Sequence, residues 1–379
     1  MSAPEIYSPG LEGVIAGETA ISTITGGLRY RGYPVTELVE KCTFDEVAFL
    51  LLHGELPTRT QLAEFQQRLA AAQKLPSVLS QLLQSLPKNA VPMDVLRTGV
   101  SILAHYDPEL SDQSRAANLR KAERLLAQIP LIITEYYRAT KNQPPVPPKA
   151  GLSFAANLLY MLNGTLPSEF DARAFDVSLI LYAEHEFNAS TFTARVVCST
   201  ESDLHASITA AIGALKGRLH GGANEQVMAM LLKTGGPDKA EAWIRSALAR
   251  KEKVMGFGHR VYKHGDVRAK VLKEYAKQAA QRAGTSAWES AAETIENVLA
   301  QEKNLFPNLD WPAGRLYHAL GLEVPLYTPF FVASRVTGWA AHVIEQREHN
   351  RLIRPRSRYT GPEERHVIPI EARQAPAGA

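Results

Sequence analysis

The sequence predicts an all-α protein built from many packed helices. Helix-capping patterns open several segments, and apolar residues recur behind them at helical spacing. No alternation of strands with helices, no repeat of fixed period and no array of heptads can be traced along the chain. The few strand-like stretches are short and lie near the two ends. These observations favour packed helices over any architecture built on a parallel sheet.

The first two helices are clearly marked. Thr43 and Glu46 form a capping box ahead of the apolar run VAFLLLHG, and Gly54 with Pro57 ends that helix. The segment TRTQ at residues 58–61 opens the next helix in the same way, and the apolar positions that follow it fall on one face. Each segment therefore predicts an amphipathic helix with a defined start.

The other elements follow from similar patterns. Residues 20–24 and 28–31 are expected to form a small hairpin around Gly26 and Gly27, and HVIPI near the C-terminus is strand-like. The prolines of residues 141–151 predict a stiff connection, either a hinge between domains or a rigid surface loop within one domain. Further helices are expected near residues 76–86, 92–105, 115–140, 151–163, 171–199, 203–216, 222–234, 238–251, 267–283, 287–302, 311–320 and 327–349.

Length and charge limit the classes of protein. A chain of 379 residues can bury a large core and is long enough for two domains. Its formal net charge of +3 is too close to neutral for a nucleic-acid binder. Only two cysteines occur, Cys42 and Cys198, which favours a reducing compartment over a disulfide framework. No signal peptide can be read at the N-terminus, so we expect a cytoplasmic protein.

One apolar stretch, residues 324–344, is long enough to cross a bilayer. Arg335 stands near its middle, where an arginine costs roughly 2.5–3.5 kcal/mol on insertion scales. Pro325 and Pro329 also interrupt its first turns. The stretch is therefore interpreted as a buried helix of a soluble protein that holds Arg335 inside, and no membrane partner is expected.

The stretch KEKVMGFGHRVYKHGDVRAK at residues 251–270 gathers glycines, histidines and basic residues around a tight turn. It fails as a dinucleotide fingerprint, because a third glycine is missing and neither a strand before it nor a suitably spaced acidic residue after it can be read. A metal site is also disfavoured, because no H-E-x-x-H pattern occurs and Cys198 has no partner at ligand spacing. An active-site loop is the remaining interpretation.

Three histidines and one aspartate stand out. His185, His220 and His259 are spread along the predicted helices, and two of the three stand beside glycines at a predicted helix start or loop, where the exposed backbone allows a ligand to approach closely. Asp310 in NLDWPAG precedes a helix start led by proline, where a simple helix cap is the alternative. Singly, each histidine is more often structural than catalytic. A carboxylate beside two neutral histidines suits abstraction of a proton next to a carbonyl group.

Arginines near such a site indicate a substrate that carries carboxylates, because a planar guanidinium binds a carboxylate through two hydrogen bonds. The candidates are Arg268, Arg335, Arg354 and Arg356. For the last two, a solvated basic tail is the alternative.

At these residues the chain resembles the citrate synthase family, in particular the bacterial and archaeal dimeric type that includes 2-methylcitrate synthases. The blocks that carry the resemblance are AEHEFNASTFTARVV, GALKGRLHGGANEQVM, MGFGHRVYKHGD, NLDWPAG and SRVTGWAAHVIEQ, and it covers nearly the whole chain. It implies the citrate synthase fold, with the active site in the cleft between two helical domains of a homodimer. Residues 1–221 and 323–379 would form the large domain, and residues 222–322 the small one.

The resemblance implies a transferase of central metabolism, of the citrate (Si)-synthase type. Acetyl-CoA would condense with oxaloacetate in a Claisen-type reaction, and citryl-CoA would then be hydrolysed. Asp310 would remove a methyl proton from acetyl-CoA, and His220 would stabilise the resulting enol. His259 would protonate the ketone of oxaloacetate as the new carbon–carbon bond forms.

The same resemblance implies binding roles. His185, Arg268 and Arg335 would hold the carboxylates of oxaloacetate, and Arg354 would reach across from the other subunit. The residues expected to contact CoA are Val254, Met255, Gly256, Phe257 and Gly258, through their backbone at the adenine, and Lys263, at a phosphate. No metal and no permanently bound cofactor is required.

Two residues depart from the family pattern. Arg218 stands where a proline is common before Leu-His-Gly, and its charge is expected to keep His220 neutral. Val267 replaces the proline of Asp-Pro-Arg, which should relax the backbone beside Arg268 and raise the KM for oxaloacetate.

Two other functions stay open on the sequence. A 2-methylcitrate synthase would use propionyl-CoA with the same residues, and one methylene changes binding by only ~1–3 kcal/mol. A non-catalytic CoA-binding or regulatory protein on the same fold is the further alternative. The combination of His220, His259 and Asp310 argues against it, because a protein that only binds CoA needs no general base.

Overall fold

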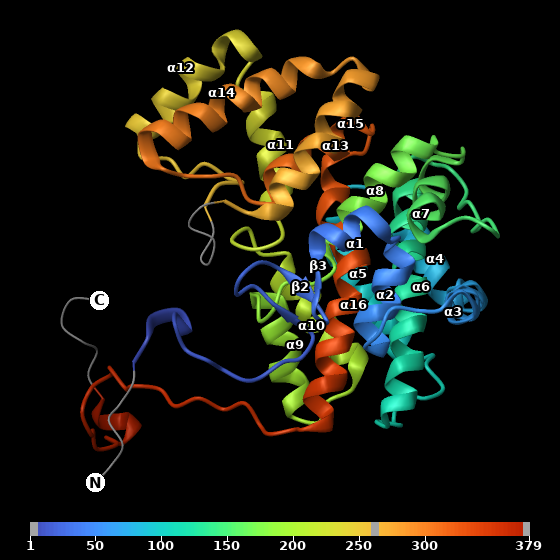
Figure 1. The fold of residues 1–379 in the computed structure, drawn as a ribbon. Helices are drawn as coiled ribbons and strands as arrows, with labels where there is room; N and C mark the ends of the chain where they lie inside the picture. Colours follow the sequence, from blue (N-terminus) through green and yellow to red (C-terminus); the bar gives the residue numbers. More distant parts are fainter. Residues whose placement is uncertain (1–6, 259–264, 374–379) are drawn as a thin grey trace.

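The structure is a computed structural model that describes residues 7–258 and 265–373. Regular structure in these ranges is almost wholly helical, which confirms the all-α class (Figure 1). Up to residue 182 the helices are α1 (Val35–Lys41), α2 (Phe44–His53), α3 (Arg59–Ala72), α4 (Ser77–Ser85), α5 (Pro92–Ala104), α6 (Arg115–Thr140), α7 (Phe154–Asn163) and α8 (Glu169–Tyr182). Those that follow are α9 (Ala189–Ser199), α10 (Leu204–Leu215), α11 (Ala223–Lys233), α12 (Pro237–Ala249), α13 (Val267–Ala283), α14 (Ser286–Lys303), α15 (Asp310–Ala319) and α16 (Tyr327–Glu348).

Local sequence explains where these helices start. Both predicted capping boxes form, with the side chains of Thr43 and Thr58 accepting the N–H groups of Glu46 and Gln61. The predicted hairpin also forms, as strands β1 (Ser22–Thr23) and β2 (Arg29–Tyr30), with Ser22 opposite Tyr30. A third strand that was not predicted, β3 (Tyr33–Pro34), pairs antiparallel with β2 and leads into α1, which was not predicted either.

Two sequence expectations were wrong. Residues 171–199 do not form one helix, because the chain breaks at residues 183–188 between α8 and α9. Glu186 in this break has a φ of +51°, which an α-helix cannot contain, and the Asn188 side chain caps α9 by accepting the N–H of Thr191. The segment HVIPI forms no strand in the described part of the chain, and its last residue begins the short 3₁₀ helix η3 (Ile370–Ala372).

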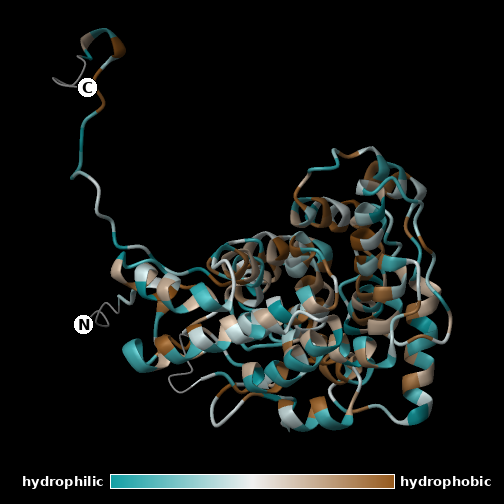
Figure 2. Ribbon diagram, turned by 90° about the horizontal axis from the view of Figure 1, so that it is seen from above, coloured by the Kyte–Doolittle hydropathy of each residue, from teal (hydrophilic) through white to brown (hydrophobic). Residues whose placement is uncertain are grey.

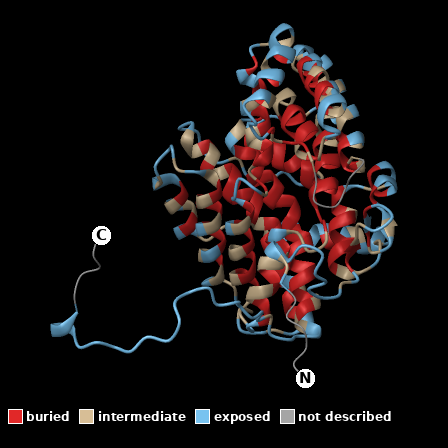
Figure 3. Cartoon of the chain, turned by 90° about the vertical axis from the view of Figure 1, so that its left-hand side faces the viewer, coloured by how far each residue is buried: buried red, intermediate tan, exposed pale blue. Residues whose placement is uncertain are grey.

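Helix α16 is the central element of the core. It packs against α2, α6, α8, α9 and α10, and nearly all of its side chains are buried. Buried residues fill the middle of the helical body, and exposed residues lie toward its outside (Figure 3). Apolar residues concentrate on the inward faces of the helices around it (Figure 2). Arg335 lies in this helix and is 2% exposed, as the charge in the middle of residues 324–344 predicted. In the described residues, no helix is long and apolar enough to span a membrane.

Helices α11 to α15 form a second group at the top of Figure 1. Within this group α12 packs on α14, α13 packs on α15, and α11 packs on α15. The group meets the rest of the molecule where α13 and α15 contact α8 and where α11 contacts α16. The residues between the two groups are therefore brought together by α8, α11, α13, α15 and α16.

The chain after α16 leaves the helical body. From residue 351 onward it runs outward in an extended path (Figure 1), and Arg358 in this tail lies over the ring of Tyr7 at 4.9 Å. Its side chains are almost all exposed, and they include large apolar ones at Leu352, Tyr359, Val367, Ile368 and Ile370.

Candidate active site

The break between α8 and α9 is fixed from three sides. Tyr30 donates from its hydroxyl to the carbonyl oxygen of Glu184 over 2.9 Å, and the N–H of Glu186 donates to Ser22 Oγ over 2.9 Å. Arg335 donates from Nε to the carbonyl oxygen of Tyr182, the last residue of α8, over 2.5 Å. These contacts take up backbone groups that the helix would otherwise use, and they hold His185 in a buried position at the break.

Asp310 is the first residue of α15, and its carboxylate does not cap that helix. Oδ1 accepts a hydrogen bond of 2.7 Å from the Tyr182 hydroxyl, and the Asp310 N–H donates to Asn308 Oδ1 over 3.1 Å. Burial raises the pKa of the carboxyl to about 6, against the opposing effects of the Tyr182 hydroxyl and of the charges of Arg268 and Arg335. A carboxyl with this pKa is mostly ionised at neutral pH and has the basicity that a general base needs there.

His220 lies in the turn that precedes α11. The backbone N–H of Ser190 donates to its Nε2 over 3.2 Å, and the Ser190 hydroxyl lies 2.8 Å from the same nitrogen. Because a backbone N–H can only donate, Nε2 is an acceptor and the ring proton is on Nδ1. Burial lowers the pKa of His220 to about 3, and Arg335 acts in the same direction. The ring is neutral, as expected, but its pKa is lowered by burial and by Arg335 and not by Arg218, whose side chain is exposed.

Two arginines converge beside Asp310. Arg335 lies over the ring of Phe331 at 4.6 Å, and burial lowers its pKa to about 10, against the effect of the Glu184 carboxylate. Arg268, near the start of α13, is close enough that its charge also lowers the pKa of Arg335. Within the described residues, neither terminal nitrogen of Arg335 makes a hydrogen bond. Two guanidinium groups in one partly closed site suit a ligand with two carboxylates.

Arg268 is itself oriented by a carboxylate. Asp266 accepts from Arg268 Nη2 over 2.7 Å and from Nε over 3.0 Å, and both side chains are buried. Asp266 also caps α13 by accepting the backbone N–H of Arg268 over 3.0 Å. The pair holds the guanidinium on the first turn of α13 even though Val267 lacks the conformational restriction of proline.

The loop of residues 254–258 lies against the start of α15. The N–H of Asn308 donates to the carbonyl oxygen of Gly256 over 2.9 Å, and the rings of Phe257 and Trp311 lie 4.5 Å apart. Gly256 has a φ of +83°, and a Cβ atom there would lie only 2.7 Å from a neighbouring valine methyl group. The stretch proposed to contact CoA is therefore packed directly on the residues that position Asp310.

The structure brings most of the predicted residues together, but not all. Asp310, His220, Arg268 and Arg335 surround one site, and His185 is buried in the break beside it. Arg354 is exposed in the outward tail, as is Arg356. His259 and Lys263 lie outside the described residues.

Sequence reasoning missed several residues of the site. Tyr182 holds Asp310, Ser190 holds His220, and Asp266 holds Arg268. Phe331 lies between them, with its ring 4.1 Å from that of Tyr182 and 6.3 Å from that of His220. Tyr182, Ser190 and Asp266 stand within five residues of a candidate histidine or arginine along the chain, which was the only available signal.

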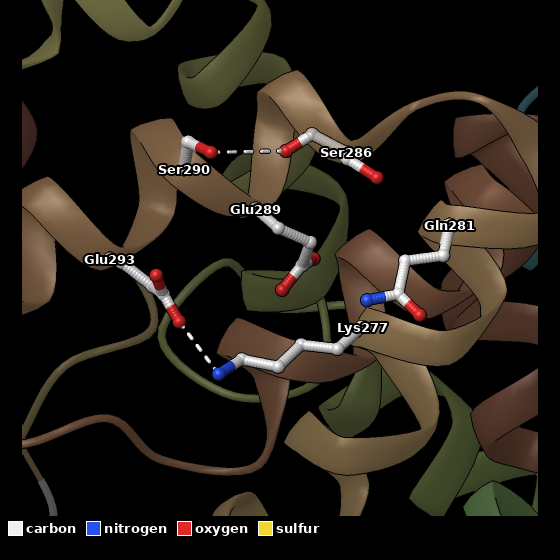
Figure 4. A pocket seen from close by; sticks show the side chains of 6 residues that line it. All are labelled: Lys277, Gln281, Ser286, Glu289, Ser290 and Glu293. Carbon is white, nitrogen blue, oxygen red and sulfur yellow. Dashed lines mark hydrogen bonds and ion pairs between the residues drawn. The ribbon is translucent and has the colours of Figure 1, made fainter.

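Two cavities lie apart from this site. One, of about 220 Å³ between α13 and α14, is lined by Lys277, Gln281, Ser286, Glu289, Ser290 and Glu293 (Figure 4). The other, of about 520 Å³, is lined mainly by residues of the loops after α5 and α9. Neither contains a candidate site residue. Across residues 7–258 and 265–373, no group of three or more His, Cys, Asp or Glu side chains is placed to hold a metal ion.

Comparison with known proteins identifies relatives over the whole chain. Residues 10–356 match the family described as "Citrate synthase, C-terminal domain". The 2-methylcitrate synthase of Mycobacterium tuberculosis is 47% identical over 97% of this chain and 95% of its own. Citrate synthase 2 of Bacillus subtilis is also 47% identical, over 96% of this chain and 98% of its own.

Solved structures agree in fold. Citrate synthase from Thermoplasma acidophilum, in a ternary complex with carboxymethyl coenzyme A and oxaloacetate, superposes with a TM-score of 0.93 at 34% identity, over 98% of this chain and 100% of that one. Citrate synthase from Thermotoga maritima superposes with a TM-score of 0.87 at 40% identity, over 98% and 100% of the two chains.

Proposed function

Because the chain belongs to the citrate synthase family, we propose that it condenses acetyl-CoA with oxaloacetate and hydrolyses the resulting citryl-CoA to citrate and CoA. One observation carries this proposal. Asp310, poised as a base by burial, shares a site with a neutral His220 and with the two guanidinium groups of Arg268 and Arg335. A base, a neutral hydrogen-bond donor and a site for two carboxylates are what enolisation of a thioester next to a keto diacid requires.

The geometry assigns each group a role. Oδ2 of Asp310 takes a proton from the carbon next to the thioester, and His220 donates from Nδ1 to the thioester oxygen as it becomes an enolate. A neutral imidazole is suited to this step, because its proton stabilises developing negative charge without a net transfer. Arg268 and Arg335 bind the carboxylates of oxaloacetate. His259 is proposed to protonate the ketone oxygen as the carbon–carbon bond forms.

The acyl group is the second part of the proposal. We place acetyl-CoA first, with propionyl-CoA as the alternative that relatives named 2-methylcitrate synthase favour. The test is thiol release with oxaloacetate and each acyl-CoA under identical conditions. A single methylene changes kcat/KM by about 10- to 200-fold. A kcat/KM higher for acetyl-CoA by a factor in this range supports the citrate synthase assignment, and the reverse order replaces it with 2-methylcitrate synthase.

The role of the base has its own test. Asp310→Asn is expected to lower turnover by at least about 10²-fold while the enzyme still binds oxaloacetate, since proton transfer typically contributes ~10²–10⁴-fold. In the wild-type enzyme, kcat should fall as the pH drops below about 6, because protonated Asp310 cannot accept the methyl proton. Full turnover in Asp310→Asn would reject the assignment. A chain that binds CoA but turns over neither acyl-CoA would be the non-catalytic alternative.

Assembly completes the proposal. We propose a cytoplasmic homodimer in which Arg354 of each chain reaches the other chain's site, and in which residues 222–322 form a small domain that closes on the rest. The outward path of the tail and its exposed apolar side chains support an arm that packs on a second copy (Figure 1). Mixing Arg354→Ala subunits with Asp310→Asn subunits tests it: each parent is expected to be inactive, and the heterodimer should regain one complete site.

The stereochemical course is proposed to be of the Si type. Citrate made from labelled acetyl-CoA and cleaved by a stereospecific lyase would return the label in acetate if this is correct, and in oxaloacetate if it is not.

A further inference from the structure

Tyr182 makes two contacts that link separate parts of the site. Its hydroxyl donates to Asp310 Oδ1 over 2.7 Å, and its own carbonyl oxygen accepts from Arg335 Nε over 2.5 Å. Its side chain is 1% exposed, and its ring lies 4.1 Å from that of Phe331. One residue at the end of α8 therefore contacts both the carboxylate on α15 and the guanidinium on α16.

We propose that Tyr182 is a positioning residue for the general base: it holds Oδ1 of Asp310, and thereby presents Oδ2 to the carbon that loses its proton. This inference rests on the proposed function of Asp310. Within the described residues, no other side chain donates to this carboxylate and Oδ2 makes no hydrogen bond, so the Tyr182 hydroxyl is the contact that selects which oxygen faces the substrate.

The hydroxyl also acts on basicity. Burial raises the pKa of Asp310 to about 6, whereas the bond from Tyr182 favours the ionised form. Burial raises the pKa of Tyr182 as well, so the phenol keeps its proton and remains a donor throughout the working pH range. A hydrogen bond to a charged acceptor changes such an equilibrium by about ten-fold or more. Without it, Asp310 would be protonated over a larger part of the neutral range.

The backbone of Tyr182 gives this contact a second consequence. Arg335 is one of the two proposed oxaloacetate ligands, and its Nε is held by the same residue that holds the base. The end of α8 therefore contacts both the proposed base and one proposed oxaloacetate ligand. The substitution Tyr182→Phe separates these effects, because it removes the hydroxyl and keeps both the ring on Phe331 and the carbonyl that accepts from Arg335.

The test is the dependence of kcat on pH in Tyr182→Phe at saturating substrates. The acid limb of the profile is expected to move up by about one pH unit, with kcat lowered by about 10- to 100-fold at neutral pH and little change in the KM for oxaloacetate. Tyr317→Phe is the matched control: Tyr317 is also fully buried, but its hydroxyl donates to Ser178 over 3.1 Å and does not contact Asp310. An unmoved acid limb in Tyr182→Phe, or an equal shift in the control, would overturn the proposal.

A second readout separates this inference from the proposed function. In substrate-free enzyme labelled with ¹³C-aspartate, the Asp310 carboxyl signal is identified by its absence in Asp310→Asn, and its pKa should rise in Tyr182→Phe. If that pKa rises while turnover is unchanged, the hydrogen bond is real but Asp310 is not the base, so the proposed function fails. If turnover falls while the pKa stays the same, the positioning role of the hydroxyl fails.

If Tyr182→Phe does not fold, 3-fluorotyrosine introduced at position 182 keeps the proposal testable. Fluorination makes the phenol a stronger hydrogen-bond donor, so the acid limb should move to lower pH, opposite to the effect of removing the hydroxyl. A limb that does not move, or that moves upward, would overturn the proposal in this form too.

Discussion

Asp310→Asn is predicted to stabilise the fold while it removes turnover. An aspartate side chain ordinarily has a pKa near 3.9, and burial raises that of Asp310 to about 6. A pKa shift of about two units corresponds to at most ~3 kcal/mol in the free energy of unfolding. The expected effect is ~1–2 kcal/mol, because the carboxylate is partly open to solvent. The raised folded-state pKa makes ionisation unfavourable to the fold. The loss of stability caused by ionised Asp310 is therefore absent below about pH 4, grows as the pH rises, and reaches its full size above about pH 6.

Thermal unfolding at two pH values measures this effect. At pH 7.5 the Tm of the variant should lie about 2 °C above that of the wild type. The difference is small because, in a chain of this length, each kcal/mol of unfolding free energy changes Tm only slightly. Near pH 4 the two Tm values should coincide. Both proteins must be compared at one concentration, since subunit association shifts Tm. Glu64→Gln, on the exposed face of α3, is the control and should change Tm at neither pH. A variant that melts below the wild type at pH 7.5, or differs equally at both pH values, would refute the reasoning.

Three further substitutions test the surroundings of the site. Gly338→Ala would place a Cβ atom 2.2 Å from Glu184 Oε2 in a packed core, so a loss of ~1–3 kcal/mol is expected in denaturant unfolding despite the better helix propensity of alanine. Val267→Pro occupies the first position of α13 after an extended residue, and should lower the KM for oxaloacetate, whereas an unchanged or higher KM would count against it. Asp266→Ala leaves the buried Arg268 without its carboxylate and should both raise that KM and cost ~3–5 kcal/mol of stability, which steady-state kinetics and thermal melts would show.

The sequence predicted helices well wherever their ends are marked locally. The boxes at Thr43 and Thr58 form as the side-chain pattern requires, and α6 begins and ends within the predicted range of 115–140. The sequence did not predict the break at residues 183–188, because the contacts that break the helix come from β1, β2 and α16, which are distant in sequence. A run of helix-forming residues cannot show that a distant arginine will bind its last carbonyl group.

The residues of the site also differ in how clearly the sequence marks them. His220, Asp310 and Arg335 could be picked out because turns, a helix start and a charge in an apolar run mark them in the sequence. Tyr182 could not, because a tyrosine in an apolar segment usually fills a core, and only its 2.7 Å contact with Asp310 gives it another role. The sequence predicted that the His220 ring is neutral but could not show which nitrogen carries the proton, since Ser190 reaches Nε2 only in the folded chain.

A buried chain of charges explains how Arg335 stays ionised inside the core. Arg195 donates to His342 Nδ1 over 2.8 Å and pairs with Glu345 at 2.7 Å, so the ring proton of His342 is on Nε2, which donates to Glu184 Oε1 over 2.9 Å. That bond, together with the charge of Arg335, keeps Glu184 ionised against the effect of its burial. The ionised carboxylate in turn opposes the loss of charge on Arg335. The charge of Arg335, a proposed oxaloacetate ligand, therefore depends on Glu184 and, through Glu184, on residues of α9 and α16.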